Sequence, residues 1–161
     1  MAFDAFLTIP GVKGESRDHA YPEGIRVLSW GWGLEMSGNA HAGPGAGAGK
    51  VAVDKLSFTK CVDSSSTALL LFACKGTHLK EACLIVRKAG DVPLEYLRIT
   101  LNDVLVSNIT TGGERRKVRL TEQVALNFAR FRMEYTPQSD AGGKGATSTA
   151  AWDIPANKAV G

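Results

Sequence analysis

The sequence has few of the residues that build metal centres and disulfide frameworks. It holds only three cysteines and three histidines among 161 residues. Cys61, Cys74 and Cys83 are an odd number with apolar neighbours, which favours reduced core thiols over disulfides. No two cysteines have the close spacing of zinc ligands, and the histidines are scattered along the chain. We therefore expect neither a metal nor another cofactor.

Long hydrophobic runs are also missing, so we expect no membrane insertion. The apolar opening, residues 1–9, is short, lacks a basic leader and runs directly into Pro10-Gly11. This pattern is typical of a first strand and not of a signal peptide. The protein is therefore expected to begin its life in the cytoplasm.

A strong excess of charge is absent as well. The net charge of +3 is too small to indicate nucleic-acid binding. The densest basic run is Arg115-Arg116-Lys117, with Arg119 close behind it. A contact with phosphates or an acidic partner is one interpretation, but no aromatic residues are interleaved with these cations, so we prefer a solvated hairpin loop.

Catalytic and nucleotide-binding motifs are not found. The sequence has no Gly-x-Ser-x-Gly elbow and no His-Glu-x-x-His pair, so nothing places a catalytic group. The glycine-rich loop that ends at Gly49-Lys50 is a poor P-loop, because Pro44 occupies the first glycine position and Val51 replaces the serine or threonine. A strand also follows where a phosphate-binding helix should begin.

The composition that is present suits one soluble globular domain spanning residues 1–161, with 44% hydrophobic and 22% charged residues. Residues 51–90 read as strand, helix and strand. The helix is an unbroken apolar run, residues 68–74, with capping oxygens in residues 63–66 before it and Lys75-Gly76 after it. Because apolar residues point to most of its sides, we expect this helix to be largely covered.

Period-two alternation predicts the remaining elements as strands: residues 3–9, 25–34, 51–63, 94–106 and 118–135. The alternation slips at Asp54-Lys55, Asn102-Asp103 and Ala129-Arg130, as β-bulges would produce. Bulged long strands curl a sheet, so we predict a mainly β fold, a small antiparallel β-barrel or a tightly closed sandwich, with one flanking helix. Residues 37–50 form an extended glycine and alanine loop, and residues 136–161 a loose tail with Trp152 docked.

One face of the second strand carries almost no side chains. Leu28, Trp30, Trp32 and Leu34 share one face, whereas Ser29, Gly31 and Gly33 form the other. The two tryptophans could form a sugar-binding platform, but we prefer a core role. The bare face either lies against a neighbouring backbone or lines an open, water-filled space.

Motifs along the whole chain resemble the haemolysin-coregulated protein (Hcp) family, the tube subunits of bacterial type VI secretion systems. The matching stretches are Met1-Ala2-Phe3-Asp4, Gly11-Val12-Lys13-Gly14-Glu15-Ser16, Trp30-Gly31-Trp32-Gly33, Ala48-Gly49-Lys50-Val51, Leu56-Ser57-Phe58-Thr59-Lys60, Gly76-Thr77-His78, Val86-Arg87-Lys88-Ala89-Gly90, Glu95-Tyr96-Leu97, Leu105-Val106-Ser107, Leu126-Asn127-Phe128-Ala129, Trp152-Asp153 and Asn157-Lys158. Gly31 stands where several relatives carry a small polar residue.

The resemblance implies a non-enzymatic protein whose six copies close into a ring. Rings would stack into a hollow tube inside a contractile sheath and below a spike protein. The tube would carry or chaperone small effector proteins and leave the cell without a cleaved signal peptide. Ser29, Gly31 and Gly33 would face the bore. We place ring or stacking contacts in the 37–50 loop, with Ser37, Asn39, His41, Pro44 and Lys50 as the candidate residues.

Two other functions remain as alternatives at this point. A hydrolytic effector built on the same barrel would need a fused catalytic domain or a nucleophile elbow, and we expect neither. A carbohydrate-binding module would use Trp30 and Trp32, and tryptophan fluorescence that glycans leave unchanged would count against it.

Overall fold

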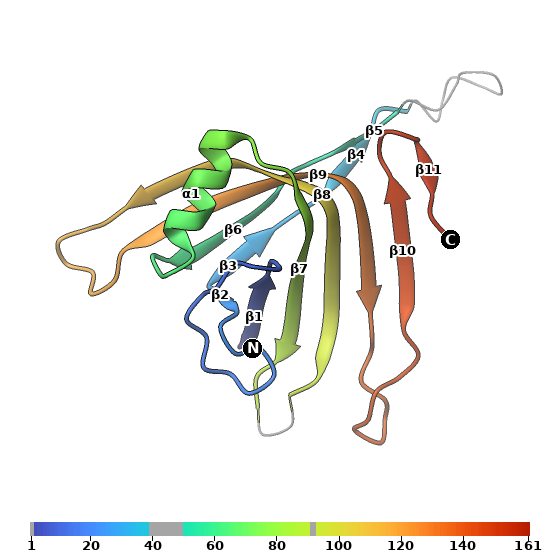
Figure 1. Cartoon of the computed structure of the whole chain (residues 1–161). Coiled ribbons are helices and arrows are strands. Elements are labelled where there is room, and N and C mark those ends of the chain that lie inside the picture. Colours follow the sequence, from blue (N-terminus) through green and yellow to red (C-terminus); the bar gives the residue numbers. More distant parts are fainter. Residues whose placement is uncertain (1, 39–49, 91–92) are drawn as a thin grey trace.

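The computed structural model describes residues 2–38, 50–90 and 93–161. Its elements are, in chain order, β1 (Phe3–Thr8), β2 (Ile25–Val27), β3 (Ser29–Gly31), β4 (Leu34–Met36), β5 (Val51–Val53), β6 (Leu56–Cys61), α1 (Ser66–Lys75), β7 (Leu79–Lys88), β8 (Glu95–Gly112), β9 (Thr121–Tyr135), β10 (Ser148–Asp153) and β11 (Lys158–Ala159). The strands pair antiparallel and curl around a shared interior, with α1 packed outside them (Figure 1). The predicted mainly β architecture with one flanking helix is confirmed in the described part of the chain.

The long strand β9 organises the sheet. One of its edges pairs with β8, whereas the other edge is divided: residues 121–126 pair with β6 and residues 130–135 pair with β10. From β8 the ladder continues through β7 and β1 to β2, and from β6 it continues to β3. The two ends of the ladder, β2 and β3, are consecutive in the chain and are joined at Leu28, whose amide donates to the Thr59 carbonyl 2.8 Å away. The sheet is thus curled but not closed by hydrogen bonds, which corrects the prediction of a closed barrel.

The predicted second strand, residues 25–34, is in fact three short strands. Ile25 and Val27 are buried in β2, but Leu28 is 52% exposed, and Leu34 in β4 is 51% exposed. The strand breaks at Leu28 because the chain changes partner there, from β1 to β6. The prediction that both leucines share a buried face with Trp30 and Trp32 is therefore wrong.

The predicted bulge at Asp54-Lys55 is a corner between two sheets. Among the described residues, β5 pairs only with β4, in a separate two-stranded sheet, whereas β6 begins at Leu56 in the main sheet. The amide of Asp54 donates to the Gly33 carbonyl at 3.0 Å, and this bond holds the base of the β4–β5 hairpin. The hairpin projects away from the curled sheet (Figure 1).

The other two predicted slips lie opposite each other across the β8–β9 ladder. Asn102 faces Arg130, and Val104 faces Phe128, so the register is the same before and after the irregular residues. Asp103 has a φ of 53°. At this point the apolar side chains of both strands change from odd to even positions or the reverse. The sheet bends there, and neither strand gains an unpaired residue. A true register shift, which the sequence did not reveal, occurs further along β8 between Val106 and Asn108.

The loop between β8 and β9 is shorter than predicted and lies later in the chain, at residues 113–120. β8 extends to Gly112, and β9 begins only at Thr121. Val118 is fully exposed and Leu120 is 57% exposed, so neither residue belongs to the predicted strand that starts at residue 118. Val118 and Leu120 alternate with polar residues as in a strand, but no neighbouring element in the described part of the chain covers them.

The helix α1 begins and ends close to the predicted positions. Gly76 takes the left-handed conformation at its C-terminus, with φ of 62°. Ser65 at its N-terminus makes no side-chain cap, and the Asp63 carboxylate instead accepts from the Ser65 amide at 2.9 Å. Leu69 is fully buried, but Leu70 and Leu71 are more than half exposed. The expectation of a largely covered helix is therefore wrong for this single chain.

A buried ion-pair cluster ties α1 to the sheet. Lys60 in β6 is fully buried, and its Nζ lies 2.5 Å from Glu122 Oε1 and 2.9 Å from Asp63 Oδ1. The Lys60 ammonium also donates to Ser66 Oγ at 3.0 Å, and Thr111 donates to Glu122 at 3.2 Å. Buried charges need such partners because desolvation penalises an unpaired ion.

The C-terminal tail, residues 136–161, contains regular structure where a loose segment was predicted. β10 pairs with β9, and the sequence analysis did not find this strand. Trp152 is half-buried and packs against the core. Its neighbours in β10 are small residues, Ala150 and Ala151, which left the strand with too little alternation to be recognised.

Candidate functional site

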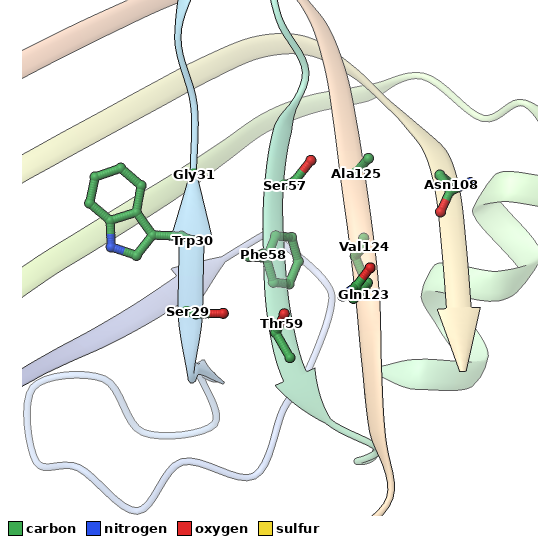
Figure 2. A pocket seen from close by; sticks show the side chains of 10 residues that line it. All are labelled: Ser29, Trp30, Gly31, Ser57, Phe58, Thr59, Asn108, Gln123, Val124 and Ala125. Carbon is green, nitrogen blue, oxygen red and sulfur yellow. The ribbon is translucent and has the colours of Figure 1, made fainter. Parts of the chain in front are cut away.

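A shallow hollow of about 250 Å³ lies on the outward face of β3, β6, β8 and β9 (Figure 2). Its outward-pointing members are small or uncharged polar residues: Ser29, Gly31, Ser57, Thr59, Asn108, Gln123 and Ala125. A hollow forms here because Gly31 has no side chain, and a Cβ added to it would meet nothing within 4 Å.

Strand register arranges these residues in two rows across the sheet. In the first row, Ser29 faces Thr59, which in turn faces Gln123. In the second row, Gly31 faces Ser57, which faces Ala125. Because side chains at paired positions point to the same side of a sheet, each row forms one continuous strip.

The residues between these rows point into the protein. Phe58 and Val124 are buried, and Trp30, paired with Phe58, is half-buried against the core. One face of this sheet region therefore builds the core, and the other is left open. The same alternation that stabilises the fold fixes the direction of the hydroxyl and amide groups in the hollow.

The hollow offers hydrogen bonds but no charge. None of its lining residues is ionisable. In the described part of the chain, the side chains of Ser29, Ser57 and Gln123 make no hydrogen bond to other side chains, whereas Thr110 Oγ1 donates to Asn108 Oδ1 at 3.2 Å. The described residues also contain no cluster of three or more histidine, cysteine or acidic residues that could hold a metal ion. Such a surface can bind by hydrogen bonding and shape, and it supplies no acid, base or nucleophile with an altered pKa.

Groups with altered pKa values lie elsewhere. The Arg87 guanidinium hydrogen-bonds to Asp18 and holds the pKa of that carboxyl below its ordinary value. Burial raises the pKa of the Cys83 thiol. Burial, together with a hydrogen bond to Glu95, raises the pKa of Tyr21. These groups connect β1, β7, β8 and the loop before β2, so they stabilise the fold and do not form a reactive cleft.

The predicted site residues fall into three places. Ser29 and Gly31 line the hollow, whereas Gly33 lies at the base of the β4–β5 hairpin, where a Cβ would come within 3.8 Å of Asp54 Oδ2. Ser37 and Lys50 are exposed at the two roots of the predicted loop. The remaining interface candidates, Asn39, His41 and Pro44, lie outside the described residues.

Several lining residues were missed by sequence reasoning. Ser57 and Thr59 alternate with buried Leu56 and Phe58, so the pattern showed their direction. The pattern could not predict the strand order, which places Ser57 and Thr59 beside Ser29 and Gly31. Gln123 in β9 was hidden for the same reason, because its link to β3 passes through β6.

The contacts of Trp30 and Trp32 distinguish a core role from a sugar-binding platform. The Trp32 ring meets Phe131 edge-on with centroids 4.8 Å apart, and its Nε1 donates to the Asp54 carbonyl at 3.1 Å. Trp30 packs against the core from β3. Both indoles thus contribute to the interior, which supports the core interpretation.

None of the described helices has the length and apolar character needed to cross a membrane.

Comparisons with known proteins agree over nearly the whole chain. The family model described as "Type VI secretion system effector, Hcp" matches residues 6–135. Protein hcp1 of Pseudomonas aeruginosa is 48% identical to this chain over 159 residues, covering 98% of each protein. Hcp1 from Salmonella typhimurium has a crystal structure that matches with a TM-score of 0.84 at 37% identity, covering 99% of this chain and 100% of that chain. A solved "type six secretion system protein" matches with a TM-score of 0.92 at 25% identity, with the same coverage. The chain therefore belongs to the Hcp family and is a tube subunit of a type VI secretion system.

Proposed function

We propose that six copies of this chain close into a ring, that rings stack into a hollow tube, and that the polar hollow faces the bore. The supporting observation is the pair of uncharged strips that contain Ser29 and Gly31, on a sheet whose other side forms the core. A bore lined this way stays hydrated and holds cargo only weakly, which suits a carrier. In this proposal the protein acts structurally and not as an enzyme.

The β4–β5 hairpin supports assembly. A two-stranded hairpin is only marginally stable by itself in water. Leu34 and Met36 on this hairpin are 51% and 50% exposed. Exposed apolar groups on a projecting element mark an interaction site. We propose that this hairpin and the loop that it carries, with Ser37, Asn39, His41, Pro44 and Lys50, make ring or stacking contacts.

The partners in this proposal are those of a contractile injection device: other copies of the chain, a surrounding sheath, a spike protein at the tip, and small effector proteins in the bore. The subunit is cytoplasmic before assembly and is expelled without a cleaved signal peptide. A stable ring needs lateral contacts that bury about 1,600 Å² each.

Ring formation is tested with the purified protein. Gel filtration with light scattering should give the mass of six copies, and negative-stain images should show rings. A stable monomer at micromolar concentration would contradict the proposal.

The position of Gly31 predicts a variant that affects cargo and not assembly. The side chain of Gly31→Arg enters open space, so rings should form as in the unmodified protein, while the amount of co-purifying effector falls several-fold. The measurement is gel filtration followed by mass spectrometry of protein bound to rings isolated from cells. Gly31→Ala is the matched control and should keep most cargo. Loss of the hexamer in Gly31→Arg would show that Gly31 is packed in the assembly and does not face the bore.

A further inference from the structure

A second hollow, of about 620 Å³, lies away from the polar strips and has both apolar and cationic walls. We call it the arginine groove, and its lining residues are Glu15, Arg17, Arg26, Leu28, Cys61, Val62, Asp63, Arg119 and Leu120. Three of its apolar members are unusually exposed for their size: Leu28 at 52%, Val62 at 38% and Leu120 at 57%. Neither the core nor the polar strips use these side chains.

The groove carries uncompensated positive charge. Asp63 pairs with buried Lys60, whereas Glu15, which accepts from the Ser64 amide at 3.2 Å, keeps its negative charge, so three arginines outnumber one carboxylate that is unpaired among the described residues. No carboxylate in the described part of the chain forms an ion pair with Arg17, Arg26 or Arg119. A ligand that fits this groove therefore combines apolar side chains with an acidic group.

The β4–β5 hairpin has this chemistry. Leu34 and Met36 alternate with Glu35, and all three residues are exposed. Glu35 makes no ion pair with any described residue, and its strand partner is Ala52. A hairpin that enters a groove presents both of its faces to the walls, so the leucine and methionine can cover the apolar part while Glu35 meets the arginines.

The hairpin and the far wall of the groove lie at opposite ends of the molecule. Figure 1 shows β4 and β5 projecting at one end, whereas the loop between β8 and β9, which carries Arg119 and Leu120, is at the other. One chain therefore cannot fill its own groove. Two complementary patches on opposite sides of a subunit generate a head-to-tail contact, which closes into a ring when the rotation between subunits allows it.

We propose that the β4–β5 hairpin of each copy seats in the arginine groove of the next copy in the ring. The contact pairs Glu35 with the groove arginines and covers Leu34 and Met36 with Leu28, Val62 and Leu120. This inference rests on the proposed ring function and assigns to it a specific pair of surfaces.

Charge reversal tests the pairing. Glu35→Arg should raise the concentration at which rings dissociate by at least about tenfold, because like charges then face each other across the contact. The double variant Arg26→Glu/Arg119→Glu should do the same. Combining all three changes in one chain restores opposite charges and should bring dissociation back to within about threefold of the unmodified protein. Dissociation is measured by native mass spectrometry and light scattering over a dilution series.

Two controls make the experiment decisive. Asp140→Arg reverses an exposed acidic residue outside both surfaces and should leave the rings unchanged. Far-ultraviolet circular dichroism and thermal melting should show that every variant is folded, as expected for substitutions at exposed positions.

Each outcome separates this inference from the proposed function. If the unmodified protein forms no rings, the proposed function fails. If it forms rings and Glu35→Arg forms them equally well, the hairpin–groove pairing is overturned and the ring stands. Rings that persist but no longer stack would also overturn the pairing within the ring. Failure of the triple variant to recover would show that Glu35 and the arginines do not meet.

Discussion

Lys60 is the side chain on which several parts of the fold converge. Its ammonium contacts the start of α1, β9 and its own strand, all without exposure to solvent. Removing one partner from such a cluster leaves the other charges buried and unpaired. Replacing the pair together is far less costly.

Lys60→Met should lower the free energy of unfolding by about 3–5 kcal/mol, because Glu122 and Asp63 lose their cation. The double variant Lys60→Met/Glu122→Leu should regain a large part of this loss. Urea unfolding followed by tryptophan fluorescence, at fixed protein concentration, measures both values. Lys117→Met is the matched control, since its pair with Glu114 is exposed and should contribute less than about 1 kcal/mol. Equal losses for the two single variants would contradict the prediction.

The Asp18–Arg87 pair predicts a pH dependence of stability. Arg87 lowers the pKa of Asp18 below its ordinary value of 3.8, so the unfolded chain binds this proton more readily than the folded one. The contribution of the pair is therefore complete above pH 3.8 and is lost as the pH falls through the lower folded pKa. Asp18→Asn should melt below the unmodified protein near neutral pH, and the difference should shrink in acid. A melting difference that stays constant from neutral pH to about pH 2 would rule out this linkage.

At this scale, the sequence showed Ser29 and Gly31 as a bare face of the second strand, and both residues line the polar hollow, while their position in a bore stays a prediction. It did not find Lys60 as a buried residue, since lysine is rarely buried and its partner Glu122 lies far along the chain. Pairing between distant residues becomes visible only when the strand order is known.

Among the elements, α1 has two adjacent leucines with opposite environments. Leu69 has no exposed surface, whereas Leu70 is 53% exposed. Leu69→Ala should lower the free energy of unfolding by about 2–5 kcal/mol, because it leaves a cavity between the helix and the sheet. Leu70→Ala, a chemically identical change one residue away, should cost about 0.5 kcal/mol or less in the isolated subunit. Thermal or urea unfolding of both variants checks the contrast, and similar losses would mean that Leu70 is also packed.

Strands were predicted well where the neighbouring strands stay the same along most of the element, as in β1 and β7. The predictions were wrong where the chain changes partner. At Leu28 the pairing passes from β1 to β6, and between Val53 and Leu56 it passes from one sheet to another. Alternation records which side of a strand is apolar and carries no information about which strand lies beside it.

For the whole molecule, the sequence predicted a mainly β domain with one outer helix and, through resemblance, its family. The prediction that failed was the burial of several apolar side chains, which in fact lie at the surface. Leu28, Leu34, Leu70 and Leu120 all have apolar side chains that this single chain does not cover. In the proposed assembly, copies of the chain cover the first two and Leu120, so we expect the pattern that was interpreted as core to include interface residues.

The junction at Leu28 also determines when the fold can be completed. β7, β8 and β9 follow one another along the chain and pair with their sequence neighbours, so these contacts are local and form rapidly. β1 cannot pair with β7 until about seventy more residues have been made. β6 likewise cannot pair with β9 until β9 exists, and β3 pairs with the other edge of β6. During synthesis, the N-terminal third of the chain therefore leaves the ribosome before β7 and β9 exist. We therefore expect residues 25–31 to pair late, across the gap between β1 and β6, and the polar face to acquire its full width only at that step.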